Sequence, residues 1–507
     1  MSSFLLPQWL SLRVFKLLSL FLASYFTILV IGVWNTPVLS QNSPEIRAVW
    51  LTTSDTDTLL DRPKMKEAMA NLASLHFNTI YPVVWNSGYA LYPSRVAQEA
   101  RIQPFVHKGL QGQEPLKELI DEAHRYKMLV LPWFEFGFMA PPTSELALKH
   151  PNWLTRARDG TQTTYSAAGE VVWLNPFHPQ VQKFITDLVM EVVNNYDIDG
   201  IQFDDHLCLP VKLGYDTYTT NLYRQETGSE PPSNYRDANW MRWRANKLTE
   251  FVTQLNQRIK AKNPNKILSI SPNPYHPAYN SFLQDWLDWV RKDLIDELII
   301  QVYRSDFAVF QNEITRPEIR EAKAKIPVGI GILTGLPNRL TPIDFVRQKA
   351  LAVRQQRLGI AFFFYGSMWN TSDEARLDRK SNFQSLFPYQ SRRIARVNPV
   401  KPTTPVATPT VTTTPTKPTT PVATPTKPTT PTPPINAVNP IKPINPVNPT
   451  NTMTPINTVT PNPTNVVTPS NAVIPNPTIT PKIDSSIDPM NVTGESIFID
   501  EFLQFTP

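Results

Sequence analysis

Between Ile46 and Tyr365 the chain alternates short apolar runs with amphipathic stretches of helical period, and this alternation constrains the fold more than any other feature. Continuous apolar strands separated by helices indicate a parallel sheet that is covered on both faces. Because the unit recurs eight times, the sequence predicts an α/β fold of the (β/α)8 type, a TIM barrel, rather than an open doubly wound sheet. The expected strands are 46–51, 78–85, 128–134, 198–203, 266–271, 297–302, 327–332 and 359–364.

The stretches between these strands carry apolar residues at helical spacing. The expected helices are 63–75, 114–126, 181–195, 241–260, 281–290, 312–323, 344–355 and 373–386. Three longer segments, 85–112, 136–177 and 206–240, follow the second, third and fourth strands. We expect these segments to form a wall or a lid over one part of the barrel mouth.

Proline usage marks the end of the barrel domain. Nearly half of the 51 prolines fall after Asn398, and residues 397–481 contain no Gly, Asp or Glu. The segment Lys401–Thr410 recurs unchanged as Lys417–Thr426. Such sequence cannot bury a core, so we predict a barrel domain over 44–395 and a disordered, extended stalk over 396–482, followed by a short tail over 483–507. The stalk is either a spacer that spans a cell wall or a passive tail.

An apolar run over 17–34 follows Arg13 and Lys16, as in an export signal. The run is long enough to remain as a membrane anchor, so 1–43 is predicted to be a signal peptide or an anchor. Either outcome exports the barrel, to the periplasm or the cell surface. Cys208 is the single cysteine, which excludes an intramolecular disulfide.

Several kinds of partner are excluded by composition and motif. The net charge of +6 is spread along the chain without a Lys/Arg run, so no nucleic-acid partner is expected. No Gly-x-Gly-x-x-Gly follows the first strand, which removes the main dinucleotide signature. No Cys/His cluster has zinc-ligand spacing, and we expect neither a cofactor nor a metal.

Acids, amides and aromatic side chains gather where the expected strands end, which in a barrel is the mouth that holds the active site. Aromatic rings stack on sugars, and amide and acid groups bind vicinal hydroxyls, so this inventory predicts a carbohydrate cleft. The candidate substrate-binding residues are Arg47, Trp50, Trp85, Tyr89, Trp133, His206, Asn273, Gln301, Tyr303 and Trp369. Any one of the tryptophans alone could instead pack the end of the barrel.

Glycoside hydrolysis needs two carboxyl groups, and three candidates lie at the predicted mouth. Asp204, after the fourth strand, is the candidate nucleophile or transition-state stabiliser. Glu135, after the third strand, is the candidate general acid, because its aromatic neighbours would raise its pKa by desolvation. Asp205 competes for either role. The alternatives left open are that Asp204 caps the next helix and that Glu135 pairs with Arg47.

Several motifs resemble the bacterial glycosyl-hydrolase-like family 10 barrels. They are Arg47-Ala48-Val49-Trp50-Leu51, the 78–85 strand with Leu91-Tyr92-Pro93-Ser94, Asp199–Asp205, Gln301-Val302-Tyr303 and Gly331-Ile332. The resemblance covers about 44–390, and Asp-Gly-Ile-Gln-Phe-Asp-Asp is its most specific element. It implies a TIM barrel, an exported hydrolase and a link to enzymes that cut peptide-free peptidoglycan glycan strands. By position, the strand-four acid of the family falls on Asp204 or Asp205.

Two positions depart from related barrels: His206 stands where a chitinase-like pattern has Glu, and Asn273 stands where many related barrels have the acid. Our leading hypothesis is an exported glycoside hydrolase that acts on a cell-envelope polysaccharide, with peptidoglycan glycan strands as one candidate. The alternatives are a non-catalytic glycan-binding barrel and a structural envelope protein. The expected partners are a polysaccharide and, through the N-terminal segment, a membrane.

Overall fold

The structure, a computed structural model, describes residues 44–103, 114–166, 169–336, 339–369, 375–391 and 393. The predicted signal or anchor, the stalk and the tail lie outside the described residues. Within the described part of the chain, no helix is long and apolar enough to cross a membrane.

A single parallel sheet forms the centre of the described domain. Its strands follow the order β5-β2-β1-β16-β13-β12-β11-β10-β6. Their bounds are β1 Arg47–Leu51, β2 Thr79–Pro82, β5 Leu129–Val130, β6 Trp133–Phe134, β10 Gly200–Asp204, β11 Ile267–Ser271, β12 Glu297–Gln301, β13 Val328–Leu333 and β16 Gly359–Phe363. Each of the eight predicted strands overlaps one of these elements or, for 128–134, two of them.

The barrel closes through its third strand, which is divided into β5 and β6. These two halves stand at the two ends of the strand order, so both neighbours of the third strand are paired. A parallel bridge between Val83 and Trp133 joins the second strand to the second half of the third. The predicted (β/α)8 barrel is confirmed.

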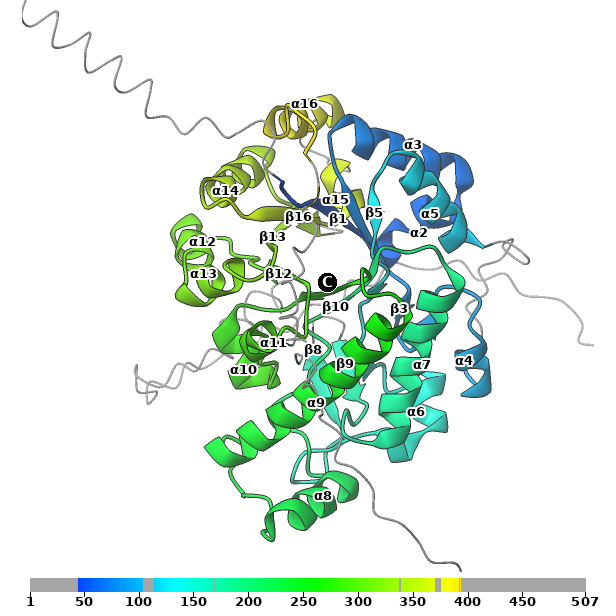
Figure 1. Ribbon diagram of the computed structural model, residues 1–507, viewed down its shortest axis with the longest axis vertical. Coiled ribbons are helices and arrows are strands. Elements are labelled where there is room, and N and C mark those ends of the chain that lie inside the picture. Colours follow the sequence, from blue (N-terminus) through cyan, green and yellow to red (C-terminus); the bar gives the residue numbers. More distant parts are fainter. Residues whose placement is uncertain are drawn as a thin grey trace, which may run out of the picture. The chain divides into compact units, whose positions relative to one another are not determined.

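Helices surround the sheet (Figure 1). They are α3 Arg62–Ser74, α5 Pro115–Arg125, α7 Pro179–Asn195, α9 Ala238–Lys262, α10 Tyr275–Phe282, α11 Trp286–Arg291, α12 Phe307–Ile314, α13 Pro317–Lys323, α14 Ile343–Gln355 and α16 Arg376–Leu386. Two helices expected as single elements are each divided. Leu283 adopts a left-handed conformation and ends α10, whereas Pro317 starts α13 at a first-turn position that tolerates its missing N–H.

The long segments after the second, third and fourth strands carry small elements of their own. They are the hairpin of β3 Trp85–Asn86 and β4 Tyr89–Ala90, the sheet of β7 Met139–Ala140, β9 Gly169–Trp173 and β8 Thr163–Ser166, and the helices α4 Arg95–Glu99, α6 Glu145–Lys149 and α8 Thr217–Thr227. Further elements, η2 Pro151–Trp153, β14 Gly335–Leu336 and β15 Arg339–Leu340, complete the loops.

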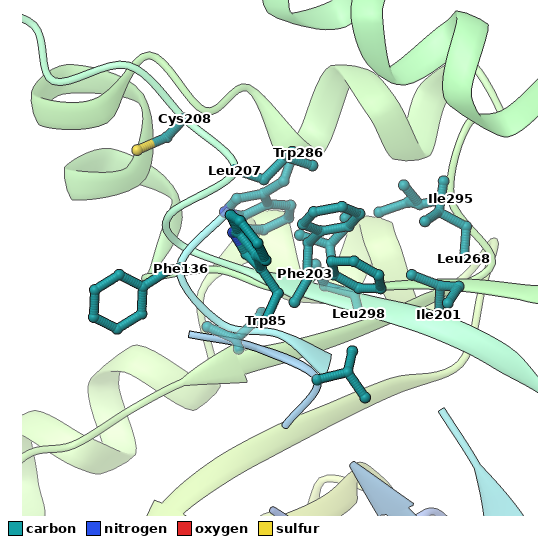
Figure 2. Close-up of a cluster of buried hydrophobic side chains, with 14 of the residues drawn as sticks. Trp85, Phe136, Ile201, Phe203, Leu207, Cys208, Leu268, Trp286, Ile295 and Leu298 are labelled. Atoms are coloured by element: carbon teal, nitrogen blue, oxygen red, sulfur yellow. The ribbon is translucent and has the colours of Figure 1, made fainter. Parts of the chain in front are cut away.

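The core beneath these segments is buried and rich in aromatic side chains. Figure 2 shows Trp85, Phe203 and Trp286 together with aliphatic side chains and Cys208. Phe203 stacks on Phe134 with ring centroids 5.2 Å apart, which packs β10 against β6. The residues immediately before Glu135 and Asp204 are therefore fixed by close packing.

A fully buried arginine braces the segment after β10. The Arg244 guanidinium donates hydrogen bonds to the carbonyls of Val211 (2.6 Å), Leu213 (2.7 Å) and Tyr235 (2.6 Å). Burial lowers the pKa of Arg244 to about 9. The hydrogen bonds tie the chain after β10 to α9, so the loop that follows the acids has a rigid base.

The chain after α16 returns to the N-terminal end of the barrel. Arg393 forms an ion pair with Glu297 at 2.5 Å, and both side chains are almost completely buried. Glu297 also accepts hydrogen bonds at 2.8 Å from the hydroxyls of Tyr81 and Ser269. This end of the barrel is thus closed by a polar contact to a segment from outside the (β/α) repeat.

Candidate active site

Asp204 is the last residue of β10, and its side chain points into the barrel. Strand alternation places Gln202 and Asp204 on one face and Phe203 on the other. Gln202 accepts a hydrogen bond from the Trp50 indole at 2.7 Å, which marks the barrel interior. A turn begins directly after Asp204, so Asp205 is not held to the opposite face of a continuing strand.

Both carboxylate oxygens of Asp204 are occupied by protein groups. Oδ1 accepts from the backbone N–H of His206 at 2.9 Å and lies 3.0 Å from its Nδ1. Oδ2 accepts from the Trp133 indole at 3.2 Å. Asp204 is also only 2 % exposed, so it is poorly placed to contact a substrate.

Asp205 is held by two amides that come from the next two strands. Asn273 donates to Oδ2 at 3.1 Å, and Gln301 donates to Oδ1 at 2.9 Å. Gln301 itself is oriented by a second hydrogen bond, to the Ser271 carbonyl at 2.8 Å. With a side chain that is 22 % exposed, Asp205 is the carboxylate of the pair that is open to the mouth.

Glu135 follows β6 and receives a hydrogen bond from Asn86 Nδ2 at 2.6 Å. Ser87 donates to Asn86 Oδ1 at 2.7 Å and so fixes the amide orientation. Burial, with a further contribution from Asp204, raises the pKa of Glu135 to about 7. A carboxyl group with this pKa holds a proton in a large fraction of molecules near neutral pH, as a general acid requires.

His206 connects the three acids. Its Nδ1 contacts the Glu135 carbonyl at 2.8 Å as well as Asp204, and Asp205 lies 4.0 Å away. Because both close partners are acceptors, Nδ1 carries a proton. Burial alone would lower the pKa of His206, but Asp204 and Asp205 outweigh it and raise that pKa to about 10. The ring is therefore a cation that joins the loops after β6 and β10.

Close backbone packing also holds the loop after β6 against the loop after β10. Phe138 donates its N–H to the His206 carbonyl at 3.2 Å. A Cβ atom on Gly137, whose φ is +45°, would lie 2.6 Å from that carbonyl oxygen. The approach of the two loops thus depends on glycine at this position.

The structure brings most of the predicted polar residues together. Asn273 and Gln301 bind Asp205, and Trp133 binds Asp204. Tyr303 is half-buried beside Phe363, with ring centroids 5.5 Å apart. Burial and the three acids hold the pKa of the Tyr303 phenol well above its usual range, so its hydroxyl stays a donor.

Asn86 was absent from the predicted site although it follows the second strand directly. Its position in the sequence carried the same signal as Asn273, a polar residue at the carboxyl end of a strand. Tyr89, its cross-strand partner in the β3–β4 hairpin, is partly buried and packs against the core.

Five predicted substrate contacts need correction. Arg47 lies at the N-terminal end of β1, away from the mouth, and pairs with Glu45 at 2.9 Å; this also removes the alternative in which it pairs with Glu135. Trp50, Trp85 and Trp369 are 1 %, 0 % and 6 % exposed, and Trp133, at 3 % exposed, likewise lies inside the barrel, where it donates to Asp204. Their rings fill the barrel and its flanks, because the apolar area that they bury outweighs any gain from display at the surface.

Asp204, Asp205 and His206 are also a geometrically possible metal site, since ligand atoms from all three lie within 4.8 Å of one another. In the structure these donors already have protein partners: Asp204 Oδ1 accepts from the His206 N–H, and the amides of Asn273 and Gln301 donate to Asp205. The cluster is better described as an ion pair within an acidic site.

We expect His206→Gln to lower the free energy of unfolding by about 1.5–3 kcal/mol at pH 7, as for a hydrogen bond to a charged group. The folded-state pKa of His206, about 10, lies above the ordinary value of 6.5. Its stabilisation is therefore complete below pH 6.5 and is lost as pH rises through 10. In urea denaturation at pH 7, 8, 9 and 10, the difference in free energy of unfolding between the wild type and His206→Gln should decrease as the pH rises. A constant gap would contradict the assignment, and exposed His276→Gln serves as the control.

Comparison with known proteins identifies relatives of the barrel region. The sequence model described as "Glycosyl hydrolase-like 10" matches residues 45–352. "Glycosyl hydrolase DigH" of Escherichia coli (strain K12) is 26 % identical over 296 residues, which cover 54 % of this chain and 65 % of that protein. "Glycosyl hydrolase YngK" of Bacillus subtilis (strain 168) is 24 % identical over 317 residues, or 55 % of this chain and 58 % of that protein. The chain thus spans less than two thirds of either relative.

A solved structure shares the fold. The PgaB (BpsB) glycoside hydrolase domain from Bordetella bronchiseptica superimposes with a TM-score of 0.53, at 12 % sequence identity, over 69 % of this chain and all of that chain. At this identity the likeness concerns the barrel alone.

Proposed function

The chain belongs to the glycosyl hydrolase-like 10 family, and we propose that it hydrolyses O-glycosidic bonds of a cell-envelope polysaccharide at the mouth of its barrel. The observation that carries the proposal is the pairing of Glu135, a carboxyl group with a pKa near 7, with a carboxylate held open to the mouth by two amides. These are the two carboxyl groups that glycoside hydrolysis needs.

Glu135 acts as the general acid that protonates the leaving oxygen, and it then serves as the base for the returning water. Asp205 faces the positive charge that develops on the sugar ring, either as a nucleophile or as a stabilising charge. Asn273 and Gln301 fix its two oxygens, so little reorganisation is needed when the charge forms. This assignment gives the role first expected for Asp204 to its rival Asp205.

Asp204 acts as a positioning residue. Its oxygens are committed to His206 and Trp133, and through His206 it holds the backbone of Glu135. Tyr303, which keeps its phenolic proton, supplies a donor for a sugar hydroxyl.

Peptide-free peptidoglycan glycan is our candidate substrate. The support is the export expected from 17–34, the proline-rich segment that follows the barrel, and the resemblance of the strand-four motif to enzymes that cut such strands. Export of the barrel is part of this proposal.

The full chain should release reducing ends from purified peptide-free glycan strands, with fragments identified by mass spectrometry. Other envelope polysaccharides, tested in parallel, define the range of substrates. If the protein binds these glycans but releases no reducing ends from any of them, hydrolysis is refuted and a glycan-binding barrel replaces it.

A further inference from the structure

A hollow opens at the same end of the barrel as the acids, where β1 and β16 end. Its volume is about 490 Å³, and none of the three acids lines it. Its walls come from η1 (Thr53–Asp55), α2 (Thr56–Leu60), α3 and α15 (Tyr365–Trp369). We propose that this hollow, the β1–β16 pocket, binds a second sugar residue of the glycan that is cut at Glu135 and Asp205. The inference rests on the proposed function and extends it to a distal subsite.

The floor of the β1–β16 pocket is built by a buried carboxyl group. Asp55 is 3 % exposed, and it accepts hydrogen bonds from the backbone N–H groups of Gly366 (2.7 Å) and Thr52 (2.8 Å). A Cβ atom on Gly366 would lie 2.7 Å from Asp55 Oδ1, so the close approach depends on glycine. These bonds join the end of β1 to the start of α15, and the pocket is therefore preformed.

Aromatic side chains complete the lower wall. Tyr365 and Trp369 contact each other with ring centroids 5.8 Å apart, and Phe364 lies beside them in the lining. Each of these rings is only 6 % exposed, so they shape the wall of the pocket, and the polar groups of the rim make the contacts that fix a ligand.

The rim carries two loose ion pairs. Lys64 lies 3.3 Å from Asp57, and Arg376 lies 3.6 Å from Glu67. All four side chains are more than half exposed, so the pairs contribute little to stability and can rearrange around a ligand. Two cations balanced by two anions favour a neutral ligand, and the mixture of donors and acceptors matches vicinal hydroxyls. A pyranose ring without a charged substituent, as every second sugar of a peptidoglycan glycan strand is, meets both conditions, and the volume lies in the usual range for small ligands.

The position of the pocket relates it to the acids. In the closed strand order, β16 stands across the barrel from β10, and β1 is separated by β2 alone from the β5–β6 strand that carries Glu135. A polymer that crosses the mouth from the acids therefore passes over the ends of β1 and β16. A monosaccharide bound at the acids alone does not reach them.

The test uses full-length Glu135→Gln protein, which retains the site while turnover is suppressed, and measures binding by titration calorimetry. The probes are a disaccharide and an octasaccharide of peptide-free peptidoglycan glycan. Adding Lys64→Ala and Glu67→Ala should weaken octasaccharide binding about tenfold, or about 1.4 kcal/mol, and leave disaccharide binding unchanged. Thr58→Trp, which fills the pocket without removing charge, should have the same effect. Lys66→Ala, on the same helix but outside the lining, is the control.

The outcomes separate the two proposals. The distal subsite is refuted, and the proposed function stands, if octasaccharide binding is unchanged in both pocket variants. The same holds if the affinities for the disaccharide and the octasaccharide fall equally. If the Glu135→Gln protein binds neither probe, peptidoglycan glycan is refuted as the substrate and the subsite falls with it.

Discussion

Replacing Glu135 with Gln is expected to lower kcat by about 10²–10⁴-fold with little change in KM. Gln keeps the size of the side chain and a polar contact to Asn86, but it cannot donate a proton to the leaving oxygen. The loss therefore falls on the transition state and not on substrate binding. Rates of reducing-end release at saturating and limiting glycan concentrations separate the two parameters.

The pH dependence of the same reaction provides an independent check. A general acid must be protonated, and the pKa of Glu135 is raised to about 7. The rate of the wild-type protein should thus fall as pH rises through 7. The residual activity of Glu135→Gln should lack this alkaline limb. Glu170→Gln, the same change at an exposed acid on β9, should keep both the rate and the limb. A Glu135→Gln protein with a wild-type profile would show that another group supplies the proton.

The sequence predicts the strands well because each is a short apolar run between polar loops, and it places Glu135, Asp204 and Asp205 at one mouth. It does not separate the roles of the two aspartates. That separation depends on the turn after Asp204 and on amides at the ends of β11 and β12. The spacing of residues in the sequence does not indicate such contacts. Arg47 is a different case, because its place near the start of the first strand already indicated the far end of the barrel.

The tryptophans show a second limit of pattern reasoning. Trp50 and Trp85 stand near strand ends, as sugar platforms do, but their indoles donate to Gln202 and to the Gly137 carbonyl inside the structure. Whether a ring at a strand end faces solvent or the barrel depends on which partners the other strands supply. The corrected site relies on amides and carboxyl groups, with Tyr303 as its half-buried aromatic.

The far end of the barrel yields the largest effect expected on stability. Glu297→Gln should lower the free energy of unfolding by about 3–5 kcal/mol at pH 7, because it leaves Arg393 as a buried charge without its counter-ion. Arg393→Met should cost a similar amount by leaving Glu297 unpaired, although the hydroxyls of Tyr81 and Ser269 still donate to that carboxylate. Urea denaturation of the full chain measures the free energy of unfolding of each variant.

The double variant shows whether these losses arise from one interaction. If the pair acts as a unit, Glu297→Gln with Arg393→Met should cost well below the sum of the single changes, because neither charge is then left alone. Glu321→Gln, which breaks an exposed pair with Arg291, should stay within about 0.5 kcal/mol of wild type. Additive losses would show that Arg393 does not pair with Glu297 in solution. Losses that are less than additive would show that the barrel folds together with the chain as far as Arg393, well past residue 352 where the family match ends.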